Sequence, residues 1–193
     1  MPACLQSDRR SFLLRLAAPL LPWLAAPLAR AHQVPALTVE AEFDGNGGAA
    51  FQVNLDPRLF LAEDPTTLPP VPAAWFRDMP ELERERTLAE ARTYVRSALT
   101  FFFGDQKAGD LEWQFDPIDG ATGEAFDDST AEVHFLAKTR TRCPQGATTS
   151  VIRLETDAKA AAVLLNSLQQ QAERRPQILF PGETSRAFRC IAE

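Results

Sequence analysis

The 193-residue sequence is poor in the side chains that most often carry catalysis and metal binding. It has two histidines, one tyrosine and three cysteines, and it contains no glycine-rich phosphate loop and no HExxH motif. Ser185, in GETSR, lacks the flanking glycines of a hydrolase nucleophile elbow. Acid–base catalysis would therefore have to use carboxylates, and no pair of them forms a recognisable set. The sequence predicts a protein that is not an enzyme, with a carboxylate-dependent hydrolase as an alternative.

An excess of positive charge is also missing, since the net charge is −6. Nucleic acids and anionic lipid surfaces both attract basic patches, so neither is an expected partner. The longest apolar stretch near the N-terminus, residues 16–28, is shorter than the ~20 residues of a membrane-spanning helix. Pro19, Pro22 and Pro27 break it further.

That stretch is typical of a signal peptide. Arg9 and Arg10 form a positive head, the apolar core follows, and Ala29-Arg30-Ala31 offers the small residues that a signal peptidase reads. We expect cleavage after residue 31. The segment RRSFL resembles a twin-arginine (Tat) signal, although an aspartate precedes the arginine pair, and a general secretory signal is the alternative.

Cleavage leaves residues 32–193 as one exported domain in the periplasm or outside the cell. Removing four arginines and one aspartate from the 20 basic and 26 acidic side chains leaves 16 and 25, a net charge of about −9. Cys4 leaves with the leader, and Cys143 and Cys190 remain. In an oxidising compartment this pair predicts a disulfide.

Alternating apolar residues predict a β-hairpin at the start of the mature chain. ALTVEAEF and AAFQVNL both have period-two patterns, and the turn sequence DGNGG joins them. The proline-rich stretch DPTTLPPVPAAW is a connection. An apolar stripe then predicts a helix over about residues 78–104, with Asp78 as its cap, Gly104 at its end and Phe101–Phe103 packed in its last turn.

Further strands are indicated in the C-terminal half. LEWQF, AEVHFLAKTRT, TTSVIRLE and QILF have strand-like patterns, and Pro181-Gly182 marks a bend between the last two strands. Residues 158–175 have the composition of a helix but a context that favours a strand. The expected fold is mainly β with one inserted helix (α+β), an antiparallel β-sandwich that is Ig-like in general shape.

Several motifs resemble the exported N-terminal region of HupE/UreJ-type membrane proteins, which are associated with nickel or cobalt uptake. These motifs are AHQVPALTVEAEF, the aromatic cluster after the helix, LEWQF and ILFPGETSR. Because those proteins continue into membrane spans and this chain does not, the resemblance implies a detached sensor-like or accessory domain. It carries over no catalytic residue.

Two groups of residues could bind a metal. Cleavage would give His32 a free α-amino group, and this amine with the imidazoles of His32 and His134 makes the three-nitrogen set of a copper site. Carboxylates crowd one loop and could bind calcium, although their order differs from that of a twelve-residue calcium loop; they are Asp116, Asp119, Glu124, Asp127 and Asp128. A solvated loop is the alternative.

The favoured hypothesis is an exported domain without a cofactor that binds or supports another protein, in particular a membrane partner linked to metal uptake. A copper- or calcium-binding protein is the second hypothesis.

Overall fold

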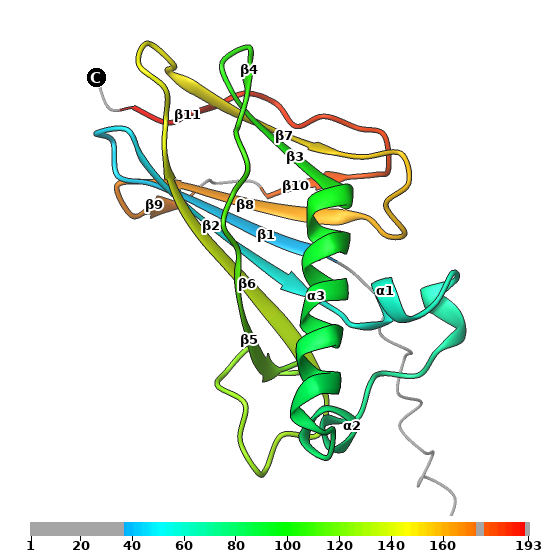
Figure 1. Ribbon diagram of the computed structural model, residues 1–193. Helices are drawn as coiled ribbons and strands as arrows, with labels where there is room; N and C mark the ends of the chain where they lie inside the picture. The colour runs from blue at the N-terminus through cyan, green and yellow to red at the C-terminus, as the bar shows by residue number, and fades with distance from the viewer. Residues whose placement is uncertain (1–36, 173–175, 192–193) are drawn as a thin grey trace, which may run out of the picture. The chain divides into compact units, whose positions relative to one another are not determined.

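The structure, a computed structural model, describes residues 37–172 and 176–191, which all belong to a unit spanning His32–Glu193. The proposed leader and His32 lie outside the described residues. The described chain forms two antiparallel-rich β-sheets and a few helices (Figure 1). The predicted α+β fold of the β-sandwich type is confirmed.

The larger sheet has seven strands in the order β10-β8-β1-β2-β6-β5, with β9 paired to β8. All neighbours are antiparallel except β1 and β8, which run parallel. The strands are β1 (Leu37–Phe43), β2 (Gly48–Leu55), β5 (Gln114–Asp119), β6 (Val133–Arg142), β8 (Ala162–Leu168), β9 (Gln171–Ala172) and β10 (Gln177–Leu179).

The smaller sheet has four strands in the order β11-β7-β3-β4. They are β3 (Leu99–Phe103), β4 (Gln106–Lys107), β7 (Thr149–Leu154) and β11 (Phe188–Arg189). The helical elements are α1 (Arg58–Leu61), the 3₁₀ helix η1 (Pro65–Thr67), α2 (Ala73–Arg77) and α3 (Glu81–Ala98). The proline-rich connection therefore contains short helical turns, and Pro65 opens η1 at the position where its missing N–H costs nothing.

The predicted hairpin is β1 and β2. Every second residue of both strands is buried on the inner face of the large sheet, as the alternation requires. In the turn, Gly45 and Gly47 have φ angles of 77° and 91°, which favour glycine. The Asp44 carboxylate accepts hydrogen bonds from the Asn46 and Gly48 amides at 2.7 and 2.8 Å, and these bonds lower the pKa of Asp44.

Two different layers cover the inner face of the large sheet. At one end the small sheet packs against it, where the ring of Phe51 lies 4.6 Å from Phe101. At the other end the helical segments do so, where Phe135 on β6 packs 5.1 Å from Phe76 of α2 and 6.1 Å from Phe60 of α1. The opposite face, called the outer face below, carries the alternate residues of the same strands.

The helix predicted over 78–104 is too long at both ends. Pro80, not Asp78, precedes the first turn of α3. At the other end Leu99 already has an extended backbone, and residues 99–103 form β3 in place of a last helical turn. Aromatic and β-branched residues favour a strand, and here Phe101 and Phe103 must face the large sheet while β7 takes the backbone hydrogen bonds.

The ambiguous segment 158–175 contains β8, so the preference for a strand is confirmed. Its place was not foreseen, since β8 lies beside β1 in parallel. In LEWQF the strand begins later than predicted, at Gln114, although Trp113 is buried as expected.

The predicted disulfide is not formed in the structure, where Cys143 and Cys190 are both free thiols. The two thiols are neighbours nonetheless. Burial, and then a hydrogen bond with the Cys190 thiol, raise the pKa of Cys143 to about 12. Joining them requires an oxidant that takes up two electrons and two protons, and a fully protonated thiol reacts slowly with such an oxidant.

If the leader directs export, as the sequence predicts, we expect the exported protein to contain the Cys143–Cys190 bond. Its mass should be lower than that of the reduced chain by two hydrogen atoms, and thiol titration in denaturant should find no free thiol. A bond closing a loop of about 48 residues stabilises a fold by ~4 kcal/mol. C143S should therefore unfold at a lower urea concentration than the oxidised wild type, and its midpoint should match that of the reduced wild type. Two titratable thiols in freshly exported protein would contradict this expectation.

Candidate functional site

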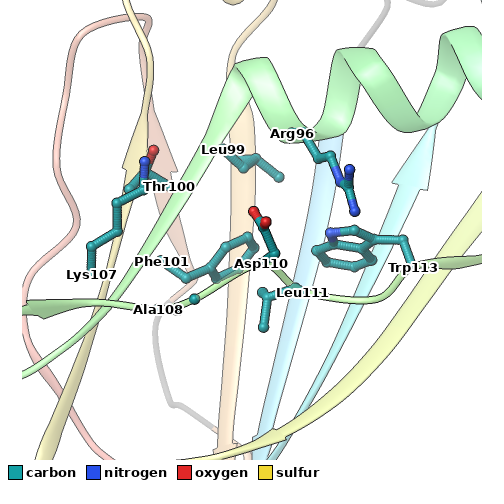
Figure 2. A pocket seen from close by; sticks show the side chains of 10 residues that line it. Arg96, Leu99, Thr100, Phe101, Lys107, Ala108, Asp110, Leu111 and Trp113 are labelled. Atoms are coloured by element: carbon teal, nitrogen blue, oxygen red, sulfur yellow. The ribbon is translucent and has the colours of Figure 1, made fainter.

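A small hollow lies between the end of α3 and the segment after β4. Its volume is about 110 Å³, below the 300 Å³ or more of a typical ligand pocket. Figure 2 shows the Arg96 guanidinium directed towards the Trp113 indole, and Asp110 also lines the hollow. The rings of Phe101 and Trp113 are 5.9 Å apart, so the hollow is bounded by packed core residues.

A larger groove of about 310 Å³ crosses the outer face over β8, β1 and β2. Its lining includes Glu40, Glu42, Ala50, Gln52 and Leu165. The two glutamates occupy successive outward positions of β1, so they line the same side of the groove together. Because a pair of catalytic carboxylates has to face the bond between them, this arrangement gives no support to the hydrolase alternative.

Two exposed apolar side chains lie at one corner of the large sheet: Ile178 on the edge strand β10, and Phe180 directly after it. Ile178 and Phe180 are 58% and 60% exposed, and Ile178 is in register with the half-buried Val163 of β8. We call Ile178 and Phe180 the apolar corner. The turn after it is held by Glu183, whose carboxylate accepts from the Phe180 amide at 2.8 Å while its own amide donates to the Phe180 carbonyl at 2.9 Å.

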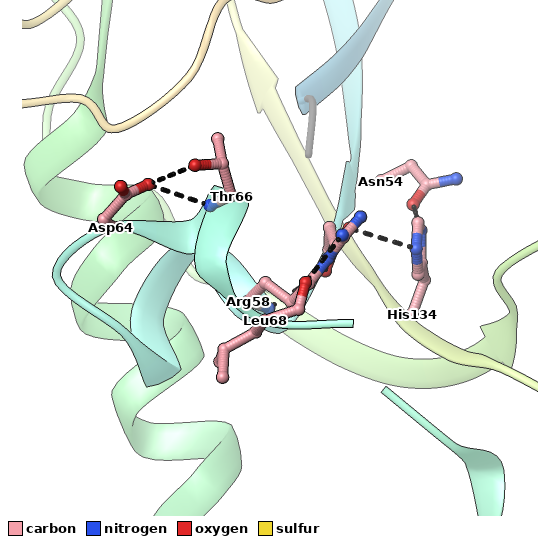
Figure 3. A network of polar contacts seen from close by, with 7 residues as sticks. Asn54, Arg58, Asp64, Thr66, Leu68 and His134 are labelled. Atoms are coloured by element: carbon pink, nitrogen blue, oxygen red, sulfur yellow. Dashed lines mark hydrogen bonds and ion pairs between the residues drawn. The ribbon is translucent and has the colours of Figure 1, made fainter. Parts of the chain in front are cut away.

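A buried ion pair lies where the chain leaves β2 (Figure 3), at the same end of the strands as Ile178 but nearer the middle of the sheet. The side chains of Asp56 and Arg58 are each 3% exposed. The Arg58 Nη2 and Nε atoms donate to the Asp56 carboxylate at 2.6 and 2.9 Å, and Nη1 donates to the Leu68 carbonyl at 3.2 Å. Arg58 thereby ties the end of β2 to the segment that follows η1.

His134 extends this network across β6. Its Nδ1 atom is 2.9 Å from the Asn54 amide oxygen, and its Nε2 atom is 3.7 Å from the Asp56 carboxylate. The backbone at Gly120 closes over the ring, because a Cβ atom there would lie 2.6 Å from the imidazole. The side chain is 15% exposed.

Burial is the largest influence on the charge of His134 and lowers its pKa. The negative charge of Asp56 opposes this effect, and Arg58 reinforces it. Glu132 and Asp119 add smaller attractive contributions. The neutral imidazole is therefore favoured near pH 7, with its ring nitrogens directed at Asn54 and Asp56.

The copper hypothesis requires His32, which lies outside the described residues, so that hypothesis stays a prediction. His134 is held within the network just described. In residues 37–172 and 176–191, no three or more His, Cys, Asp or Glu side chains are gathered so that they could hold a metal ion.

The structure does not gather the predicted calcium carboxylates into a group that could hold a metal ion within the described residues. Asp116 pairs with Lys138 at 2.9 Å. Asp119 accepts from the Ala121 and Thr122 amides, Asp127 accepts from Ser129 and Thr130, and these bonds lower the pKa of both aspartates. Glu124 and Asp128 are exposed. Asp116 therefore stabilises the pairing of β5 with β6, and Asp119 and Asp127 each stabilise a turn.

Sequence reasoning missed Asp56 and Arg58, the most buried charged side chains among the described residues. The signal was present in NLDPRLF, where an acid and a base two residues apart stand within an apolar run. Charged residues are rarely buried unless they are paired, so such a sequence indicates an internal ion pair.

No protein-family model matches the chain, and a comparison with curated proteins finds no match. Within the described part of the chain, the helices are all too short or too polar to cross a membrane.

We expect Arg58→Met to lower the free energy of unfolding by about 3–5 kcal/mol, because it leaves the Asp56 carboxylate buried without its partner. Lys138→Met is the matched control: it breaks an ion pair whose side chains are 44% and 57% exposed, and should cost less than ~1 kcal/mol. Urea unfolding measures both. Equal decreases in the free energy of unfolding for the two variants would show that the buried pair contributes no more to stability than the exposed one.

Stability should also fall as the pH drops below 6.5, the ordinary pKa of histidine. Because the folded state lowers the pKa of His134, the unfolded chain binds a proton more readily, and protonation favours unfolding. His134→Gln keeps a hydrogen-bonding side chain but removes this proton site. Urea unfolding between pH 7.5 and about 5, above the titration of most carboxylates, should give a flatter pH profile for the variant. Superimposable profiles would contradict the assignment.

Proposed function

We propose that this protein is an exported domain, released from its leader after residue 31, that docks on a membrane partner linked to nickel or cobalt uptake. The domain acts through its surface and needs no cofactor of its own. Its place of action is the periplasm or the outer side of the cell membrane.

The apolar corner is the observation that carries this proposal. Burying an apolar side chain the size of isoleucine or phenylalanine is worth about 1.5–3 kcal/mol, so two exposed side chains of this size on one corner favour a partner that covers them. The turn of Pro181 and Gly182, fixed by the hydrogen bonds of Glu183, orders the corner before any partner arrives. Ordering before binding reduces the entropy lost on association.

The resemblance to HupE/UreJ-type proteins also favours this region as the docking surface. One of the motifs that carry it, ILFPGETSR, spans residues 178–186 and so includes both residues of the corner and the turn that holds them. In those proteins the exported region is attached to membrane spans. A membrane protein is therefore the kind of partner that the resemblance favours.

Photocrosslinking in the source cell tests the proposal. A photoreactive residue at position 178 should yield an adduct with a multi-span membrane protein, identified by mass spectrometry. Position 82 is the matched control, since Leu82 on α3 is 59% exposed, almost the same as Ile178. The variant I178S/F180S should lose the adduct and lower nickel or cobalt uptake, while L82S changes neither.

Failure would be equally clear. An adduct of the same strength from position 82, no membrane protein in the adduct, or unchanged metal uptake when I178S/F180S is folded and exported would each refute the docking role. Circular dichroism and the thermal midpoint of the purified variants establish that they are folded.

A further inference from the structure

The centre of the outer face carries two columns of opposite charge. Glu40 and Glu42 point outward from β1, and Lys138, Arg140 and Arg142 point outward from β6. Lys138 pairs with Asp116. Within residues 37–172 and 176–191, no ion pair engages Glu40, Glu42 or Arg140.

The register explains why the two columns do not neutralise each other within one chain. Glu42 is opposite Ala50 of β2, and Ala50 is opposite Arg140; one row along, Gln52 separates Glu40 from Lys138. Neighbouring strands are about 4.8 Å apart, so the columns are separated by roughly 10 Å, beyond ion-pair contact. The small side chain of Ala50 between them leaves the floor of the groove low.

We propose that a second copy of this chain docks on this face, related to the first by a two-fold axis parallel to β2. Such a rotation places β1 of each copy over β6 of the other. Glu42 then meets Arg140 of the partner and Glu40 meets Lys138 of the partner, because each pair shares a row of the register. The interface is isologous, so each contact occurs twice.

Charge complementarity selects a second copy as the occupant. After the two-fold rotation, the acidic column of each copy faces the basic column of the other. Because the groove floor is low, the two sheets can approach to about 10 Å, the usual distance between packed sheets. The mature chains, each of net charge about −9, repel each other at long range, so the local pairs have to provide the attraction. The face is small for a protein interface, and we expect a reversible dimer that forms at high protein concentration.

This inference goes beyond the proposed function and uses a different part of the surface. β10, which carries the apolar corner, lies beyond β8 in the sheet, two strands away from β1. A dimer through the charged columns leaves Ile178 and Phe180 at its rim, available to a membrane partner.

Sedimentation equilibrium of the exported protein tests the dimer with charge reversals. E40K/E42K should weaken dimerisation about tenfold or more, because it places like charges over the basic column. The same change lowers the net charge from about −9 to about −5, so reduced long-range repulsion alone would strengthen dimerisation. E85K/E90K is the matched control: it changes the net charge equally, on exposed positions of α3, and should not weaken the dimer.

The combined swap E40K/E42K/K138E/R140E should restore dimerisation, since it exchanges the two columns. The neutral variant E40Q/E42Q should weaken the dimer less than the charge reversal does. It tests the same contacts if E40K/E42K does not fold. A chain that stays monomeric at millimolar concentration, a dimer that tolerates E40K/E42K, a swap that does not restore association, or a dimer abolished only by I178S/F180S would overturn the proposal. So would photocrosslinks from position 42 that reach only other proteins.

Discussion

The inner face of the seven-stranded sheet is the constraint on which the other features depend. Its strands β1 and β2 place an apolar residue on this face at every second position, and so wide a surface is stable only when covered. No single element covers it: the small sheet meets Phe51 at one end, and the short helices meet Phe135 at the other. Both covers lie on one side. The outer face is therefore the surface on which the groove, the apolar corner and the charged columns all lie, and a partner that uses the sheet meets that face.

The buried ion pair marks the place where the chain passes from the large sheet into the helical segment that covers part of it. Asp56 directly follows the last residue of β2, and Arg58 is the first residue of α1. A buried ion pair stays charged only when hydrogen bonds satisfy both of its groups. Here both oxygens of the Asp56 carboxylate accept hydrogen bonds from Arg58, and the guanidinium also donates to the Leu68 carbonyl. A hydrophobic pair of the same size could be as stable, so we interpret the ion pair as fixing the direction in which the chain leaves the sheet. His134 is then held by groups that are already in position.

Features that depend on local pattern could be predicted from the sequence, and features that depend on distant segments could not. The hairpin of β1 and β2 was correct because alternation and turn glycines lie within twenty residues of one another. The helix was extended wrongly through Leu99–Phe103, since only the presence of β7, some fifty residues later, makes a strand the better conformation there. The ion pair was missed although NLDPRLF carries a local signal for it, because part of its surroundings comes from distant residues such as His134. The carboxylates of the acidic loop were considered together as neighbours in sequence, but Asp116, Asp119 and Asp127 each bind their own turn or strand.

The parallel contact of β1 and β8 has a consequence for the order of assembly. Residue 37 pairs with residue 162, so the first strand of the domain has an open edge until the last third of the chain has been made. An open, apolar-faced edge readily pairs with a wrong strand, and closing so long a loop is slow.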